Sequence, residues 1–199
     1  LEMADSRNYA NIEFNNVEVD SASVLGSQEA GGEAIEHILD IGRIALSAEM
    51  LGNSEAAFST TVDYLKERKQ FGVLIGTFQA LQHRAAEMFC EIELTKSSVM
   101  AAMQGADENS NQLQVLASLA KSMAGDTLHL VSNEAIQMHG GEGVSQDTPL
   151  ARMYSGMRTL RLADGPDEVH RRTIARIELS KHQAARVTNI EDKAKAAEA

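Results

Sequence analysis

The sequence has one cysteine, two prolines, no tryptophan and few other aromatic residues. A single cysteine, Cys90, excludes an internal disulfide and suits a reducing compartment. No apolar run approaches the roughly 20 residues that a membrane-spanning helix needs, and no signal peptide opens the chain. Because proline is scarce while alanine and methionine are plentiful, the composition favours helix over sheet.

Basic residues are also too few for a general nucleic-acid-binding protein. The chain has 18 Lys and Arg against 29 Asp and Glu, a net charge of -11, whereas phosphate binding needs a clustered basic surface. The six histidines are scattered and match no metal-binding pattern, so we expect no metal site. The segment "GGEG" lacks the lysine and spacing of a P-loop, and no Gly-x-Ser-x-Gly nucleophile elbow occurs.

The first 25 residues differ from the rest. In "NIEFNNVEVDSASVLG" apolar residues alternate from Ile12 to Val19, which predicts two short strands or extended segments joined by a turn at Asn15–Asn16. Two strands are marginally stable alone, so we expect this β segment, over residues 1–26, to pack on another part of a protein.

Beyond "GSQEAGG", helical periodicity takes over. We expect helices over 33–68 (bent near Gly52), 77–104, 111–138, 148–154 and 166–188, with a frayed, solvated tail over 191–199. Asp107 or Asn109 is a plausible N-cap for the third of these helices. Long helices joined by short loops predict an all-α fold, an antiparallel four-helix bundle over residues 27–190.

The spacing of apolar residues also predicts which helix faces are buried. The inner face of helix 77–104 is expected to carry Leu81, Ala85, Met88, Ile92 and Val99, and that of helix 111–138 to carry Leu116, Leu119, Met123, Leu130 and Ile136.

Two stretches combine residue types in a way that suggests a site. The first, Tyr64–Gln82, places Arg68, Gln70 and Gln79 beside Phe71 at a helix junction. It is compatible with a simple loop, in which Phe71 is a hydrophobic plug and Arg68 complements a helix C-terminus.

The second stretch runs from Gln137 to Arg172 and contains paired glycines, a proline and a lone acid, Asp164. An aspartate before Gly-Pro is ordinary turn chemistry, and either Asp164 or Asp167 suits the cap of the last helix. From the residues alone, a turn residue and a general base are equally plausible roles for Asp164.

Five segments, in order, resemble the C-terminal part of the acyl-CoA dehydrogenases, FAD-dependent enzymes that introduce an α,β double bond into acyl-CoA thioesters. They are "FNNVEVDSASVLG", "ILDIGRIALSAEMLG", "ERKQFGVLIGTFQALQHRAAEM", "EAIQMHGGEGVSQDTPLARMY" and "LADGPDEVHRRTIAR". The resemblance covers residues 12–179 and implies that residues 1–26 end a preceding β-domain, followed by a helical bundle.

The resemblance also implies an FAD site. Arg68 would reach the pyrophosphate, because a guanidinium pairs well with phosphate oxygens, and Gln79 would contact the same cofactor. The signature residues Gln70 and Phe71 belong to this site. The remaining cofactor residues implied are Gln137, Met138, His139, Gly140 and Gly141, where missing side chains let backbone approach a ligand, and Pro166, Asp167 and Glu168.

For the substrate, the resemblance implies that Asp40, Ile41, Gly42 and Arg43 form a binding segment together with Gly165. Some branches carry the catalytic glutamate at the position of Gly42, so that location is empty here. The other family location for the base is Asp164, which would take the α-proton while hydride passes from the β-carbon to flavin N5.

The chain departs from the family in three ways. Most relatives carry Glu at the place of Asp164, and Ser155 and Gly156 replace a common Arg-Asp pair. The N-terminal helical domain and most of the β-domain are absent, so we expect a fragment without activity of its own. The resemblance further implies a homodimer or homotetramer, electron-transfer flavoprotein as electron acceptor, and a bacterial cytoplasmic, mitochondrial or other organellar location. The alternative is a non-catalytic helical oligomerisation or binding module.

Overall fold

The computed structural model describes residues 3, 5, 8–27 and 29–197, and side chains as far as residue 182. Its long helices are α1 (Gly31–Glu67), α2 (Gln79–Asp107), α3 (Leu113–His139) and α5 (Asp167–Ala197), with a shorter α4 (Leu150–Leu160). A two-residue antiparallel hairpin, β1 (Lys69–Gln70) and β2 (Val73–Leu74), separates α1 from α2. Short 3-10 turns cover η1 (Ser21–Ser23), η2 (Ile75–Thr77) and η3 (Gly140–Val144).

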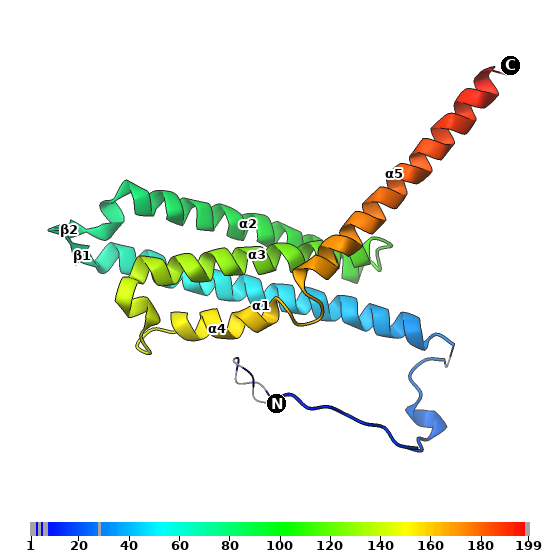
Figure 1. Cartoon of the computed structure of the whole chain (residues 1–199), viewed down its shortest axis with the longest axis horizontal. Coiled ribbons are helices and arrows are strands. Elements are labelled where there is room, and N and C mark those ends of the chain that lie inside the picture. The colour runs from blue at the N-terminus through cyan, green and yellow to red at the C-terminus, as the bar shows by residue number, and fades with distance from the viewer. Residues whose placement is uncertain (1–2, 4, 6–7, 28, 198–199) are drawn as a thin grey trace.

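The helices form an antiparallel bundle around α3 (Figure 1). Helices α1, α2 and α3 lie side by side and alternate in direction, and α4 runs back along α1 and α3. Helix α5 packs against α3 near its own start and then extends away from the bundle (Figure 1). The predicted all-α bundle is confirmed.

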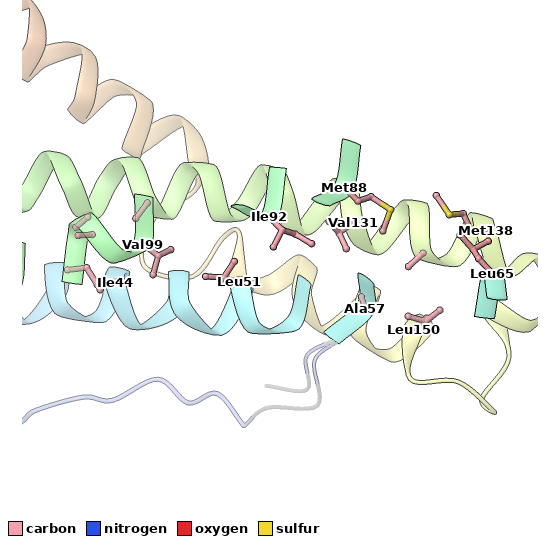
Figure 2. Close-up of a cluster of buried hydrophobic side chains, with 14 of the residues drawn as sticks. Ile44, Leu51, Ala57, Leu65, Met88, Ile92, Val99, Val131, Met138 and Leu150 are labelled. Atoms are coloured by element: carbon pink, nitrogen blue, oxygen red, sulfur yellow. The ribbon is translucent and has the colours of Figure 1, made fainter. Parts of the chain in front are cut away.

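The core lies between α1, α2 and α3 and is mostly aliphatic (Figure 2). The predicted inner face of α2 is confirmed, because Met88, Ile92 and Val99 are buried while Leu81 and Ala85 pack partly buried against them. Figure 2 shows these α2 side chains facing Ile44, Leu51, Ala57 and Leu65 of α1 and Val131 and Met138 of α3.

The predicted inner face of α3 is confirmed only in part. Leu116 and Ile136 pack partly buried against the core, whereas Leu119 is exposed. Met123 and Leu130 are partly buried. The most deeply buried positions are mainly small or β-branched residues: Ala117, Ala120, Ala124, Val131 and Ala135. Because α3 has neighbours on several sides, small residues let those helices approach closely, and an apolar stripe no longer marks the buried face.

Several boundaries also differ from the predictions. Asp107 ends α2 and Asn109 lies in the following turn, so neither caps α3, whose N-cap is Gln112. Helix α4 continues six residues beyond the predicted end at residue 154, to Leu160. The backbone of α5 is helical as far as Ala197, so residues 191–197 are not frayed, and residues 198–199 lie outside the described chain.

The segment over residues 8–27 is extended, with a bend at Asn15–Asn16 where Asn16 has φ of 49°. Of the two predicted alternatives, short strands or extended segments, the extended segments are confirmed. The two strands of the described residues, β1 and β2, lie instead at the α1–α2 junction. The apolar side chains of this segment, Ile12, Phe14, Val17 and Val19, are 62–78% exposed.

Candidate functional site

The turn between α4 and α5 presents Asp164 in an unusual backbone conformation. Asp164 has φ of 56° and Gly165 has φ of 103°, so two consecutive residues lie in the left-handed region. Among residues other than glycine, aspartate and asparagine tolerate this region best, because their short polar side chains can bond locally. The turn directs the Asp164 side chain toward α1, where it meets Gly42 and Arg43.

The Asp164 carboxylate is held in a partly desolvated place. Its side chain is 15% exposed, and Oδ2 lies 3.5 Å from Nε of Arg43. Oδ2 is buried and makes no hydrogen bond among the described residues, as is also true of Arg43 Nε. Burial raises the pKa of Asp164, although Arg43, His170 and Lys121 oppose the rise. An acid with a raised pKa and an oxygen that makes no hydrogen bond suits a general base.

Arg43 is fixed by its own helix. Its Nη1 donates to Oδ1 of Asp40 at 2.6 Å, and Asp40 is itself buried. Ser47 Oγ donates to the Arg43 carbonyl at 2.6 Å one turn later. Two of the predicted substrate-binding residues, Asp40 and Arg43, therefore form one ion pair that lies beside Asp164, whereas Ile41 is largely exposed on the same helix.

An open, mainly apolar groove of about 620 Å³ lies along α1 beside Asp164. It extends from Ile38 to Glu49, and its walls are built mostly from one face of that helix. A Cβ added at Gly42 would lie 3.6 Å from Oδ2 of Asp164, so the glycine leaves space beside the carboxylate. The lining residues are Ile38, Leu39, Gly42, Ala45, Leu46, Glu49 and Asp164.

Beneath the turn lie two buried titratable side chains that the sequence did not single out. Lys121 of α3 is fully buried and donates from Nζ to the Leu160 carbonyl at 2.7 Å. His170 of α5 is 1% exposed, and its Nε2 lies 2.9 Å from the Gly165 carbonyl. Since a carbonyl only accepts, this nitrogen carries the proton. Burial lowers the pKa of both groups, so the ring of His170 is neutral at pH 7.

Asp167, the first residue of α5, belongs to a salt-bridge network. Its carboxylate pairs with Arg161, which also donates to Asp126 at 2.9 Å, and Arg171 donates to Asp126 at 2.6 Å. The Asp167 side chain therefore pairs with Arg161, and the Asp164 side chain faces α1. Neither side chain caps the N-terminus of α5, so the capping prediction is wrong for both residues. The sequence signal for Lys121 is a lone charge among small residues in "LASLAKSMAGD".

The second group of predicted residues surrounds the hairpin at the other end of α1. Arg68 is the C-cap of α1, and its carbonyl accepts from the amide of Ile75 at 2.9 Å. Phe71 has φ of 54° and is 90% exposed, so the proposed hydrophobic plug is wrong. Its ring meets Phe78 edge-on, with centroids 6.1 Å apart. Gln70 in β1 and Gln79 at the start of α2 are exposed.

The "HGGEG" segment adjoins this end of α1. Helix α3 ends at His139 because Gly140 has φ of 61°, which a glycine adopts readily. Gln137, Gly140 and Gly141 are exposed, and a Cβ at either glycine would meet open space. Met138 and His139, by contrast, point into the bundle.

His139 is satisfied within the protein. Its Nδ1 lies 2.7 Å from the Ala135 carbonyl, and its ring stacks on Tyr64 with centroids 4.2 Å apart. The Tyr64 hydroxyl donates to the His139 carbonyl at 3.3 Å, which ties α1 to the end of α3. The side chains of Met138 and His139 therefore support the exposed segment from below.

The predicted residues thus fall into two separate groups. Asp40, Gly42, Arg43, Asp164 and Gly165 come together, with Pro166, Asp167 and Glu168 at the start of α5. The hairpin and glycine residues lie elsewhere, since Gly42 and Arg68 are separated by 26 helical residues of α1, about 39 Å. Within the described residues no group of His, Cys, Asp or Glu is placed to hold a metal ion. No helix in that part of the chain is long and apolar enough to cross a membrane.

Residues 29–179 match the family model described as "Acyl-CoA dehydrogenase, C-terminal domain". The sequence is 36% identical over 169 residues to the probable acyl-CoA dehydrogenase YngJ of Bacillus subtilis, a match that covers 85% of this chain and 44% of YngJ. The chain therefore spans less than half the length of that relative.

Solved structures agree with this match. The butyryl-CoA dehydrogenase of Megasphaera elsdenii superposes with a TM-score of 0.79 at 32% identity, over 83% of this chain and 43% of the other. The structure of PigA with FAD and proline superposes with a TM-score of 0.77 at 26% identity, over 82% of this chain and 42% of the other.

Proposed function

Because the chain belongs to the acyl-CoA dehydrogenase family, we propose that it is the C-terminal part of an FAD-dependent enzyme that forms an α,β double bond in an acyl-CoA thioester. One observation carries the proposal: the Asp164 side chain lines an apolar groove beside Gly42. The groove suits an acyl chain, and Asp164 is the acid that lines it from the α4–α5 turn.

Asp164 acts as the general base in this proposal. The carboxylate takes a proton from the substrate α-carbon, and the electrons of that C–H bond form the new double bond as hydride leaves the β-carbon. Burial in the protein raises the pKa of the carboxylate, and a bound acyl chain would desolvate it further. The proposal requires the α-carbon to lie within hydrogen-bonding range of Asp164, which lines the groove.

Arg43 tunes this base. Its guanidinium opposes the rise in the pKa of Asp164, and the Asp40 ion pair holds it in place on α1. Together with Ile41, Gly42 and Gly165, these residues form the wall against which the thioester end of the substrate is proposed to lie. Backbone groups and the cofactor of the complete enzyme would polarise the thioester oxygen.

The hairpin end fits one part of FAD. Arg68 and Gln79 are exposed polar groups beside Gln70 and the bare ring of Phe71, as a pyrophosphate and an apolar ring face require. Gln137, Gly140 and Gly141 present an open backbone, while the buried side chains of Met138 and His139 fix that backbone from beneath. At the Asp164 end, Pro166 and Glu168 are the residues proposed to touch the cofactor, since Asp167 is paired with Arg161. When bound, FAD supplies the hydride acceptor.

Within one chain, the hairpin end of α1 and the Asp164 end of α1 are too far apart to be neighbours. This separation supports a homodimer or homotetramer in which one flavin meets two subunits. Residues 1–26 are proposed as the end of a preceding β-domain, because the apolar side chains of Ile12, Phe14, Val17 and Val19 are exposed. Electron-transfer flavoprotein is the proposed electron acceptor. The chain alone is proposed to be inactive.

The test uses the full-length flavoprotein mixed anaerobically with acyl-CoA thioesters while flavin absorbance is followed. Wild type should bleach, and Asp164→Asn should retain FAD without bleaching. Asp63→Asn, the same chemical change at an exposed position of α1, is the matched control and should bleach normally. Normal bleaching by Asp164→Asn would remove this residue from the mechanism. Bound flavin that no acyl-CoA reduces in wild type would favour the non-catalytic binding module.

A further inference from the structure

The turn that carries Asp164 is anchored from inside the bundle on both of its sides. On the α4 side, the Lys121 ammonium donates to the carbonyl of Leu160, the last residue of that helix. Lysine is rarely buried this completely, because desolvating its charge is costly. A single hydrogen bond to a backbone carbonyl beneath a surface turn offsets little of that desolvation cost.

On the α5 side, the anchor is His170. Its ring donates to the Gly165 carbonyl, and a Cβ at Gly165 would lie 3.3 Å from Nε2 and 3.4 Å from Cε1 of the same ring. The imidazole therefore packs directly beneath the left-handed glycine. The two anchored carbonyls stand on either side of Asp164, one at residue 160 and the other at residue 165.

Within the described residues, Oδ2 of Asp164 makes no hydrogen bond that would hold the side chain, and Nε of Arg43 is 3.5 Å away. A non-glycine residue in the left-handed region is strained and persists only where its surroundings impose it. The surroundings that impose it here are the two anchored carbonyls.

We propose that Lys121 and His170 are positioning residues that fix the Leu160–Gly165 turn from both sides and so aim the Asp164 carboxylate along the edge of Gly42 into the groove. This inference rests on the proposed function for its catalytic consequence. A shift of about 1 Å in a reacting group can cost on the order of 100-fold in rate, so an unanchored turn should slow proton abstraction more than substrate binding.

The titratable groups around Asp164 come from three elements. Arg43 and Asp40 face it from α1, Lys121 from α3 and His170 from α5. Of these, Lys121 and His170 lie behind the turn, away from the groove lining. Replacing them changes the support of Asp164 without adding atoms to the groove.

The test compares Lys121→Met and His170→Leu with wild type in the full-length flavoprotein. Both variants keep bulk but lose the hydrogen-bond donor. The limiting rate of anaerobic flavin reduction should fall by about 10- to 100-fold, while the acyl-CoA concentration for half-saturation changes by less than about 3-fold. His170→Gln, which keeps an N–H donor, should recover most of the rate.

Thr95→Val is the matched control. Thr95 is fully buried and shares a 2.7 Å hydrogen bond with Thr127 in the core, away from the turn. Its replacement should lower thermal stability without changing the limiting rate. If the rate of Thr95→Val fell as much as that of the anchor variants, lost stability and not a misplaced Asp164 would explain the slower reaction. That result would overturn the proposal.

A crystal structure of each anchor variant gives a readout that does not depend on flavin chemistry. The proposal requires the Asp164 carboxylate to leave its place beside Gly42, and an unmoved carboxylate overturns it. If wild type fails to reduce its flavin, the proposed function is wrong, while the crystal structures still decide whether Lys121 and His170 hold the turn.

Discussion

Asp164 and Gly42 lie side by side in the lining of the groove, so closely that a methyl group on Gly42 would lie 3.6 Å from Oδ2 of the carboxylate. The two residues are 122 positions apart in the sequence and come from the α4–α5 turn and from α1. The acid has space beside it because its neighbour has no side chain.

This relationship predicts a graded response at residue 42. A methyl group at 3.6 Å is ordinary van der Waals contact, and alanine is a better helix former than glycine. Gly42→Ala should therefore stabilise the protein by about 0.5–1 kcal/mol and remain active. Gly42→Leu should block the carboxylate and abolish flavin reduction. Chemical denaturation and anaerobic reduction check the two parts, and full activity in Gly42→Leu would show that the substrate approaches elsewhere.

Asp164→Asn should change how stability depends on pH. Burial raises the folded-state pKa of Asp164 above 3.8, so the ionised carboxylate destabilises the native state relative to the unfolded chain. The difference between the two proteins should be smallest below pH 3.8, where the carboxyl is protonated in both states, and the variant should become relatively more stable as pH rises through the raised pKa. Urea denaturation at several pH values measures the difference. A wild type that gains on the variant with rising pH would contradict the sign of the shift.

His170 should make the protein sensitive to mild acid. Its folded-state pKa is lowered below 6.5 by burial and then by Lys121, so the native state binds its proton less readily than the unfolded chain. The stability it contributes is present above pH 6.5 and is lost as pH falls through and below that value. His170→Gln should show a flatter dependence of the melting temperature on pH in this range. Parallel curves for the two proteins would count against this assignment.

Gly125 makes room for the salt-bridge network of Asp167. A Cβ there would lie 2.9 Å from Oδ1 of Asp167 and 3.4 Å from Nε of Arg161. Gly125→Ala should destabilise the protein by about 1 kcal/mol, because the clash outweighs the gain in helix propensity. In an Asp167→Ala background the same substitution should become neutral or stabilising. A double-mutant cycle without coupling would show that the clash is relieved in another way.

Phe71 should matter for ligand binding and hardly at all for folding. The ring is 90% exposed, so Phe71→Ser removes little buried area and should change stability by less than about 0.5 kcal/mol. Phe58, which packs partly buried against the core, is the contrasting position, where replacement by alanine should destabilise clearly. Under the proposed function, Phe71→Ser lowers FAD retention in the full-length protein. Unchanged retention would remove Phe71 from that site.

The helices were predictable because their caps and breakers are local. Gly140 ends α3, and Pro149 precedes α4, as glycine and proline do at such positions. The inward face of α3 was not predictable from periodicity, because Ala120 and Ala124 are buried by neighbours that the sequence does not announce. Small residues in a crowded helix carry no hydrophobic signal of their own.

The site shows the same division. The turn character of Asp164 followed from the Gly-Pro step, and its place opposite Gly42 followed from the family resemblance. Its support by Lys121 and His170 depends on hydrogen bonds between residues 39 and 5 positions apart, and the first of these is not encoded by any local pattern. The pairing of Asp167 with Arg161 likewise depends on how α5 leaves the turn.

The positive φ of Asp164 also bears on which acid the position accepts. Aspartate enters the left-handed region more readily than glutamate, whose longer side chain has no comparable local bonding. In this turn, Asp164→Glu would therefore lengthen the acid and strain the backbone at once. Aspartate at this position suits the left-handed backbone of the turn. Exchanging aspartate for glutamate therefore changes the backbone conformation as well as the length of the side chain.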